Sequence, residues 1–313
     1  MMKLSTIVLL SIASSTQSLT VQPGSTVGVV GKGFISILTA KIAAINGYKS
    51  WLAIPAGDEE KVNSLIYETP GYDDELPITL VPSTDVDQLG SLLSSSDAMI
   101  LASDDSNAPL AEGVINFVTQ AETGSNLKRI VSMSRNLNNK DYGFFVKASK
   151  VSSNAEVWTC EAPLVQEFQK IDNLVKARAS ELGIEYTIAR AGTLKGGACG
   201  EVGAEDHCPQ YLASKYYELT KRDIVTWQLL FDCRGRGVVI EKGDVLPGPG
   251  IKAAFTASAP EPSIGDTSRA GMAEAMVMSL MEEKAGNSEF GVGAVEARKP
   301  PTKEEWTKLF GVL

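Results

Sequence analysis

The chain has 313 residues, of which 43% are hydrophobic and 21% charged, and a formal net charge of −9. This length allows one or two domains with a sizeable core. The acidic balance argues against a nucleic-acid partner, which needs a basic face to neutralise phosphates. A single histidine, His207, excludes metal sites built from several histidines and leaves any histidine-based triad dependent on that residue.

Residues 1–18 have the features of a targeting signal. Lys3 provides a short positive region, residues 4–15 are mostly apolar, and Thr16-Gln17-Ser18 offers a plausible cleavage site. The apolar stretch is shorter than the roughly 20 residues that cross a bilayer, so we expect no transmembrane segment. Such a signal directs a chain to the secretory pathway or, in algae with complex plastids, begins a plastid address. The absence of an Asn-x-Ser/Thr sequon favours the plastid. The alternative is that residues 5–14 form a buried strand.

After the signal, short apolar strands alternate with helical stretches, which is typical of an α/β fold with a parallel sheet. The expected strands are 26–30, 50–54, 78–82, 98–103, 129–134 and 185–190. The expected helices are 34–45, 59–68, 87–96, 110–122 and 163–183. We therefore predict a Rossmann-type, doubly wound parallel sheet.

From residue 193 onward the alternation weakens. We expect a Gly-rich loop, then the elements 211–231 (helix), 237–243 (strand), 267–284 (helix), 290–296 (strand) and 302–310 (helix). Residues of about 193–260 are predicted to form a substrate lid on the sheet, within a single domain of residues 25–313. Loops at the carboxyl ends of the strands are where an open α/β sheet binds its ligand.

The stretch Gly31-Lys32-Gly33-Phe34-Ile35-Ser36 fits the pattern Gly-x-Gly-x-x-Gly, with Ser at the last position. Gly31 would permit a tight turn, Gly33 would let the backbone approach a pyrophosphate, and the helix amides would bind the anion. The pattern predicts a dinucleotide site, and the alternative is a vestigial turn that binds nothing. Asp58, after the second strand, fits a helix N-cap better than a ribose ligand. Both NADP and NAD remain candidate cofactors, with a slight preference for NADP.

Four stretches together resemble the atypical branch of the short-chain dehydrogenase/reductase superfamily. They are "VVGKGFIS" (29–36), Asp85 after the third strand, "RIVSMS" (129–134) and "LGIEYTIARAGTLKGG" (182–197). The resemblance covers about residues 25–300 and is closest to plastid members of plants and algae. The chain departs from the family at Ala191, where the family has proline.

The resemblance implies positions for a bound dinucleotide. Lys170 matches the family's lysine with an offset of two residues, and its alternative role is a solvated helix charge. The resemblance also implies Ser132 and Ser134 on the fifth strand, and the alternative role of these two serines is to cap the end of the strand. The implied cofactor-binding residues are Gly31, Lys32, Gly33, Phe34, Ile35, Ala102, Ser103, Ser132, Lys170, Arg190, Ala191 and Gly192.

The family's catalytic Tyr-x-x-x-Lys helix lies between the fifth and sixth strands, but the helix expected there, 163–183, contains no tyrosine. Tyr142 lies upstream of that helix, at the wrong distance from Lys147 to share a helix face. Ser134 on the fifth strand is therefore a candidate oxyanion partner.

Tyr211 and Lys215 have the family's spacing on a predicted helix, but they follow the sixth strand and belong to the lid. They are the candidate proton donor and its lysine. The alternative is that this segment packs Tyr211, Leu212 and Tyr216 against the sheet while Lys215 is solvated.

The four cysteines are Cys160, Cys199, Cys208 and Cys233. They are ordinary thiols, or Cys199 and Cys208 form a disulfide or redox pair that would stiffen the lid. No spacing matches a zinc motif, so we assign no metal site.

Two functions follow from these observations. The first is an NAD(P)H-dependent reductase of a small hydrophobic carbonyl, enone or quinone. The second is a non-catalytic dinucleotide-binding protein that acts as a plastid assembly or regulatory factor with a protein partner. The missing catalytic tyrosine fits the second, and a fold shared by many functions does not decide between them.

Overall fold

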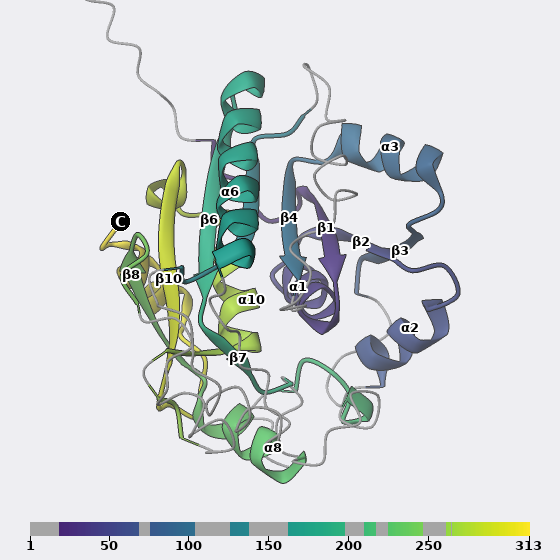
Figure 1. Ribbon diagram of the computed structural model, residues 1–313. Coiled ribbons are helices and arrows are strands. Elements are labelled where there is room, and N and C mark those ends of the chain that lie inside the picture. Colours follow the sequence, from purple (N-terminus) through teal and green to yellow (C-terminus); the bar gives the residue numbers. More distant parts are fainter. Residues whose placement is uncertain are drawn as a thin grey trace, which may run out of the picture.

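A computed structural model describes residues 19–68, 76–103, 126–137, 162–197, 210–216, 225–246, 261–263 and 265–313. An eight-stranded sheet forms its centre, in the order β3-β2-β1-β4-β5-β6-β10-β8 (Figure 1). Every neighbouring pair is parallel except β10 with β8. The expected doubly wound α/β fold is therefore confirmed, and its strand order reverses direction between β1 and β4.

Up to residue 191 the described elements lie close to the ranges expected for them, whereas the helix expected over 211–231 is described as a full element only from residue 225. The strands of the sheet are β1 (Thr26–Lys32), β2 (Lys49–Ile54), β3 (Ile78–Pro82), β4 (Ala98–Ser103), β5 (Arg129–Arg135), β6 (Glu185–Ala191), β8 (Gly237–Lys242) and β10 (Ser288–Val295). The helices are α1 (Phe34–Ile45), α2 (Glu59–Tyr67), α3 (Val86–Ser95), α6 (Ala162–Leu182), α8 (Val225–Arg234), α10 (Arg269–Met278) and α11 (Lys303–Phe310), with a 3₁₀ turn, η1 (Glu283–Ala285). The predicted helix 110–122 lies outside the described residues.

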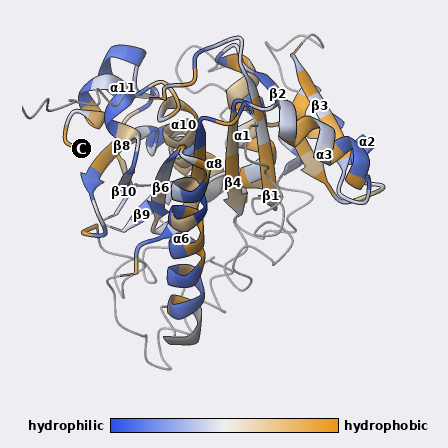
Figure 2. Cartoon of the chain, turned by 90° about the horizontal axis from the view of Figure 1, so that it is seen from above, coloured by the Kyte–Doolittle hydropathy of each residue, from blue (hydrophilic) through white to orange (hydrophobic). Residues whose placement is uncertain are grey.

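Helices cover both faces of the sheet, with α1 and α10 on one side and α6 on the other (Figure 2). Successive residues of a strand point to opposite faces, so neighbouring residues of β1 serve different cores. Val29 packs with Leu38 of α1 and Met276 of α10. Val30 packs in the second core with Ile171 of α6. Burial on both faces explains why the strands are continuous apolar runs in the sequence.

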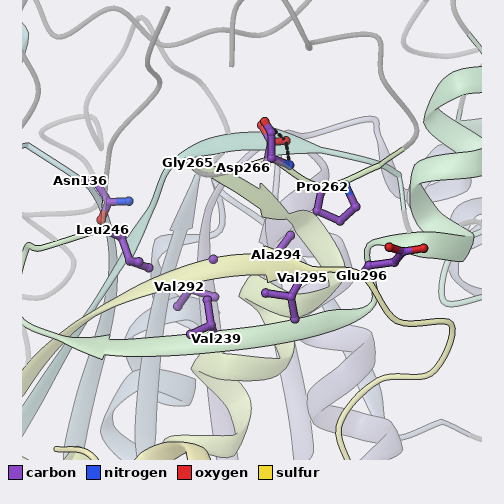
Figure 3. A pocket seen from close by; sticks show the side chains of 12 residues that line it. Asn136, Val239, Leu246, Pro262, Gly265, Asp266, Val292, Ala294, Val295 and Glu296 are labelled. Carbon is purple, nitrogen blue, oxygen red and sulfur yellow. Dashed lines mark hydrogen bonds between the residues drawn. The ribbon is translucent and has the colours of Figure 1, made fainter. Parts of the chain in front are cut away.

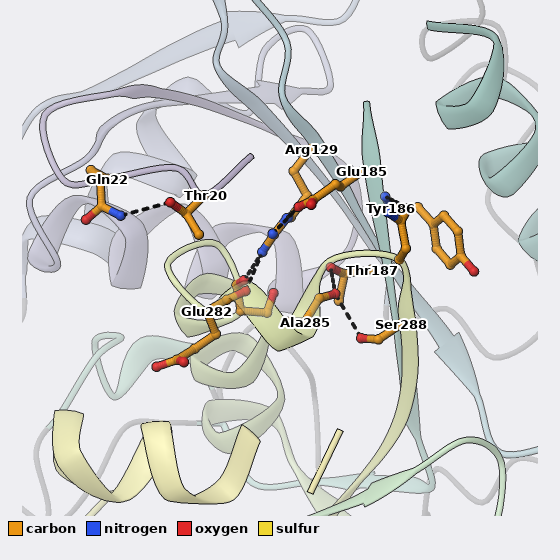
Figure 4. Close-up of polar contacts among 11 residues, drawn as sticks. Thr20, Gln22, Arg129, Glu185, Tyr186, Thr187, Glu282, Ala285 and Ser288 are labelled. Atoms are coloured by element: carbon orange, nitrogen blue, oxygen red, sulfur yellow. Dashed lines mark hydrogen bonds and ion pairs between the residues drawn. The ribbon is translucent and has the colours of Figure 1, made fainter. Parts of the chain in front are cut away.

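At the amino end of β5, Arg129 fastens the sheet to the end of α10 (Figure 4). Its guanidinium is fully buried, pairs with the Glu185 carboxylate of β6, and donates to the carbonyl oxygens of Ser279 and Glu282. The last carbonyls of a helix have no partner within the helix, and a cation there also suits the helix dipole. The amino edge of the sheet is thereby tied to the C-terminal region.

The region expected to be a lid is partly built into the sheet. Residues 237–242 form β8, the antiparallel edge strand beside β10. A second, two-stranded parallel sheet joins β7 (Thr193–Lys195) to β9 (Asp266–Ser268), so the helix predicted to begin at 267 begins at Arg269. In Figure 1, β7 and α8 lie below the sheet, at the carboxyl ends of its strands. Within the described ranges, no helix combines the length and apolar character needed to span a membrane.

Candidate functional site

The predicted dinucleotide turn joins β1 to α1. Gly33 lies between them with φ 88° and ψ −167°, a conformation that favours glycine. Helix α1 begins without a side-chain cap or an acidic residue in its first turn, and Gly33 is exposed. The first amides of a helix have no partner within the helix, and the positive end of its dipole attracts anions. The start of α1 is therefore suited to bind a phosphate group.

The other small residues of the turn hold it in shape. Gly31 pairs with Ala102 of β4, and a Cβ added at Gly31 would lie 1.5 Å from the Ala102 carbonyl oxygen. The neighbouring strand thus requires glycine at this position. Ser36, in place of the third glycine, donates its hydroxyl to the Gly33 carbonyl oxygen at 2.8 Å. Lys32 and Ser103 are backbone neighbours where β1 and β4 end. The turn therefore lies at the point where the strand order reverses.

On β5 and β6, Ser134 and Arg190 join a buried network under α6. The Ser134 hydroxyl donates to Oδ2 of Asp172 at 3.1 Å and accepts from Nη1 of Arg190 at 3.2 Å. Arg190 also pairs with Asp172 at 2.9 Å and with the Glu289 carboxylate of β10, which Lys176 of α6 contacts as well. Burial raises the pKa of Asp172 against the lowering effect of Arg190. Burial alone would raise the pKa of Glu289, but Lys176 and Arg190 together lower it.

This network holds Ser134, the candidate oxyanion partner, and Arg190, one of the residues implied to bind the cofactor. Ser132 is also fully buried on β5. Asp172 and Glu289 were missed from the sequence. Asp172 could have been found from the sequence, because it is an acid on the side of α6 that also carries the buried residues Phe168 and Val175.

Lys170 lies on the outer side of α6. It is exposed, whereas Asp172, two residues later, is buried against the sheet. Two residues are about 200° apart around an α-helix, so the side of α6 that meets Ser134 cannot carry Lys170 as well. This exposed position suits the alternative role of a solvated charge, and a role in cofactor binding stays a prediction.

Ala191 and Gly192 lie where β6 passes into the second sheet. Ala191 is buried in the core on the α1 side. A Cβ added at Gly192 would lie 2.1 Å from the Gly265 carbonyl oxygen, and the Gly192 amide donates to Oγ1 of Thr267 at 2.8 Å. Close contact with residues 265–267 explains the glycine at this position.

The prediction that Tyr211 and Lys215 share a helix is wrong. Residues 210–213 are not helical, and a helix begins only at Lys215, which is exposed. The Arg236 guanidinium lies over the Tyr211 ring, 5.0 Å from the ring centroid, and on α10 burial raises the pKa of the Glu274 carboxyl while Tyr211 lowers it. Tyr211 is thus held by α10 and by the residue before β8. Leu212 and Tyr216 are buried and Lys215 is exposed, in the manner of the alternative, although Tyr211 and Tyr216 contact Arg236 and Phe34.

The segment 210–216 also contacts the dinucleotide turn directly. The Tyr216 ring meets Phe34 of the turn edge to face, with centroids 4.5 Å apart. The Ala213 amide donates to the Leu65 carbonyl oxygen of α2 at 2.9 Å. Burial of Leu212 and Tyr216 in the core that contains Ile35 completes this contact. This part of the expected lid therefore lies against the start of α1.

A cavity of about 320 Å³ opens on the other side of β6, over β10 and β8 (Figure 3). Most of its side chains are apolar, and Asn136 lines it directly after β5. The lining residues are Asn136, Val239, Leu246, Pro262, Ser263, Gly265, Asp266, Val292, Gly293, Ala294, Val295 and Glu296.

A second, polar cavity of about 350 Å³ lies over the Arg190 network. The segments around residues 136–137 and 244–246 contribute lining residues to both cavities. A hydrogen bond joins these two segments: the Leu137 amide donates to Oδ2 of Asp244 at 2.8 Å. Its lining residues are Leu137, Gln169, Asp172, Asn173, Lys176, Arg190 and Asp244.

Several predictions fall outside the described residues. They concern the targeting signal in residues 1–18 and the residues Tyr142, Lys147, Cys160, Cys199, His207 and Cys208. Cys233 is half-buried on α8. The redox pair and the targeting signal stay predictions.

No known protein family matches the chain, and no curated protein matches its sequence. Among solved structures, the oxidoreductase ylbE from Lactococcus lactis is 14% identical, with 91% of this chain and 97% of that one covered and a TM-score of 0.50. The yeast methylglyoxal/isovaleraldehyde reductase Gre2, complexed with NADPH, is 12% identical, with 86% and 75% covered and a TM-score of 0.49. ChuY, an anaerobillin reductase from Escherichia coli O157:H7, is 11% identical, with 88% and 100% covered and a TM-score of 0.45. At such identities, the likeness to ylbE shows a shared fold.

Proposed function

We propose that the chain binds NAD(P)H at the turn between β1 and α1 and acts as an atypical short-chain reductase of a small hydrophobic carbonyl, enone or quinone. One observation carries this proposal. Gly33 exposes its backbone in a glycine conformation at the uncapped start of α1, where the strand order of the sheet reverses. Ligands of open α/β sheets bind at this point.

The residues at the turn fit the phosphates of a dinucleotide. The first turn of α1 has no acidic side chain to repel an anion, and the Ser36 hydroxyl is already bonded to the Gly33 carbonyl. The amides at the start of α1 would hold the pyrophosphate, and residues 102–103 would border it. A bound dihydronicotinamide would supply the hydride. The choice between NADP and NAD stays open, because residues 54–58 include no basic residue and their one acid, Asp58, lies 3.8 Å from Lys61.

The arrangement of Ser134 favours a second candidate function. Its hydroxyl is engaged by Asp172 and Arg190 under α6, where the family would have its catalytic tyrosine. A protein without a proton donor in this place could bind the dinucleotide without turning it over. The second candidate is accordingly a non-catalytic dinucleotide-binding factor, with a plastid location as its proposed setting.

Thermal unfolding with NADPH and with NADH tests the shared part of both candidates. A ligand that binds the native state alone raises its melting temperature in proportion to RT ln(1 + [L]/Kd). We expect a rise with at least one of the two cofactors. Absence of any rise at millimolar concentration would contradict dinucleotide binding.

The substitution Gly33→Ala should remove this rise. It strains the backbone by about 1–3 kcal/mol and places a methyl group where the pyrophosphate would approach. Gly183→Ala is the matched control, because Gly183 also has a positive φ, 66°, but lies between α6 and β6 at the opposite edge of the sheet. Both variants should lose stability, and only Gly33→Ala should lose the response to cofactor. Stopped-flow oxidation of bound NADPH by a panel of quinones and enones then separates the reductase from the non-catalytic factor.

A further inference from the structure

The polar cavity of about 350 Å³ over the Arg190 network shares no lining residue with the turn between β1 and α1. Helix α6 supplies much of its lining, through Gln169, Asp172, Asn173 and Lys176. These positions are spaced i, i+3, i+4 and i+7, so their side chains lie on one side of the helix. Among the described residues that line the cavity, Leu137 alone is apolar. The cavity therefore suits a polar ligand, and its volume is at the lower end of the range for small-molecule sites.

The charged groups that line this cavity already meet opposite charges. Asp172 pairs with Arg190 at 2.9 Å, and Lys176 pairs with the Glu289 carboxylate, which contacts Arg190 as well. The Asp244 carboxylate accepts a backbone hydrogen bond and is also attracted by Arg190. An ionic ligand would have to compete with these pairs and give up its own hydration. The network therefore favours a ligand without charge.

Several polar groups in the cavity are left for hydrogen bonds with such a ligand. Oδ1 of Asp172 and Nε of Arg190 have no hydrogen-bond partner, on side chains that are 4% and 6% exposed. The side-chain amides of Gln169 and Asn173 are exposed and make no hydrogen bond in the part of the chain that the structure describes. Because a buried polar atom without a partner costs free energy, a ligand that bonds to Asp172 and Arg190 should be stabilised. The site thus offers an acceptor, a donor and two amides that act as both.

Hydroxyl groups match this set, because a hydroxyl both donates and accepts. Of the two buried atoms, an ammonium group could serve only the carboxylate oxygen, and an anion only the guanidinium nitrogen. We propose that the cavity binds a neutral, polyhydroxylated compound of about monosaccharide size, held by Asp172, Arg190 and the amides of Gln169 and Asn173. The inference goes beyond the proposed function and does not rest on it, since the site is separate from the dinucleotide turn.

Ligand-observed NMR of the full chain tests the inference at mildly acidic pH, where glucosamine is a cation and glucuronate an anion. The neutral probes are D-glucose, D-galactose and myo-inositol, and the charged probes are D-glucosamine and D-glucuronate. We expect the tightest neutral probe to bind at least about tenfold better than either charged sugar, because the charged group must be desolvated beside a balanced network. Absence of binding by every neutral probe at millimolar concentration, or tighter binding of a charged sugar, would overturn the inference.

The two exposed amides provide a variant that should leave the fold intact. Gln169→Ala combined with Asn173→Ala removes two hydrogen-bonding groups, so the affinity for the tightest neutral probe should fall at least about tenfold. Asn63→Ala combined with Gln88→Ala is the matched control, because both side chains are exposed, on α2 and α3, and neither lines the cavity. Urea unfolding checks that both double variants are folded. An unchanged affinity in the first variant, or the same loss in the control, would contradict the assignment of this site.

Competition with NADPH separates the cavity from the dinucleotide turn. Binding of the neutral probe that persists with saturating NADPH supports a separate site. Displacement by NADPH would make the cavity part of the dinucleotide site and would overturn the inference. If the chain does not bind NADPH, the proposed function fails, whereas the measurements without cofactor still decide whether the cavity binds polyhydroxylated compounds.

Discussion

The network under α6 and the face of the sheet that α1 and α10 cover bury ionisable side chains in different ways. Under α6, Arg190 lies between two carboxylates, Asp172 and Glu289, and Glu289 also contacts Lys176. On the other side of the sheet, Lys41 of α1 is buried and donates to the Ile66 carbonyl oxygen. Glu274 of α10 is buried beside Arg236 and Tyr211, yet burial still outweighs them in setting its pKa.

Because of this difference, the stability of the protein should be sensitive to substitution on one face of the sheet and to pH on the other. In a network of opposite charges, each ion stabilises its neighbours, so the protein depends on every partner being present. Where burial outweighs the partners, the charged form itself is disfavoured, and the protein depends on pH. Substitution should therefore be costly under α6, and the protonation states of Lys41 and Glu274 should matter on the opposite face of the sheet.

The largest effect is expected for Arg190→Met. It leaves Asp172 buried without its cation, and breaking a buried pair in this way typically costs about 3–5 kcal/mol. Arg178→Met is the control, because Arg178 pairs at 3.0 Å with the exposed Glu181 on the same helix, and such pairs contribute about 1 kcal/mol or less. Urea unfolding measures both free energies. Adding Asp172→Asn to Arg190→Met should recover part of the loss, and similar losses in the two single variants would contradict the contrast.

The sequence predicted the strands well and the charged network poorly, for a physical reason. The bounds of β3 and β4 were predicted residue for residue. β4 is buried on both faces and reads as an apolar run. β3 is a partly exposed edge strand, and its apolar run is delimited by the residues around it. Asp172 and Glu289 are far apart in the sequence and meet only through the pairing of β6 with β10. Short-range patterns in the sequence do not show contacts between residues that are far apart along the chain.

The predicted Tyr211–Lys215 helix failed for a related reason. Apolar side chains at helical spacing also suit an irregular segment that several elements hold. Here Phe34, Leu65 and Arg236 contact residues 211–216, and these tertiary contacts decide the conformation. The dinucleotide turn was predictable because its glycine conformation is local.

The second expected effect is that the free energy of unfolding changes with pH in opposite directions in two pH windows. Burial raises the pKa of Glu274 from 4.5 to about 7, so between these values the native carboxyl keeps a proton that the unfolded one has released. Stability should therefore fall as pH rises through this window, by about 3 kcal/mol. Burial lowers the pKa of Lys41 from 10.5 to about 7, so above pH 7 the unfolded chain binds the extra proton and stability should rise with pH.

Two neutral variants isolate these slopes. Glu274→Gln should differ from the native chain in its pH dependence only between pH 4.5 and 7, and Lys41→Met only between pH 7 and 10.5. Free energies of urea unfolding across both windows provide the measurement. A slope that persists in the matching variant would show that another group is responsible.

The smallest effect is expected at the surface, where the loss of stability on replacing Asp85 is compared with the loss on replacing Asp58. Asp85 and Asp58 both stand at the N-cap position, of α3 and α2 respectively, but only Asp85 caps its helix, accepting from the Gln88 amide at 3.0 Å. Asp58 makes no capping bond and lies 3.8 Å from Lys61. Asp85→Ala should cost about 1 kcal/mol, the usual value of a cap, and Asp58→Ala a few tenths, the value of an exposed pair. Equal losses in thermal or urea unfolding would mean that position at the helix start, rather than the bond to the amide, sets the cost. As under α6, the partner that a charge meets in the fold should decide what its removal costs.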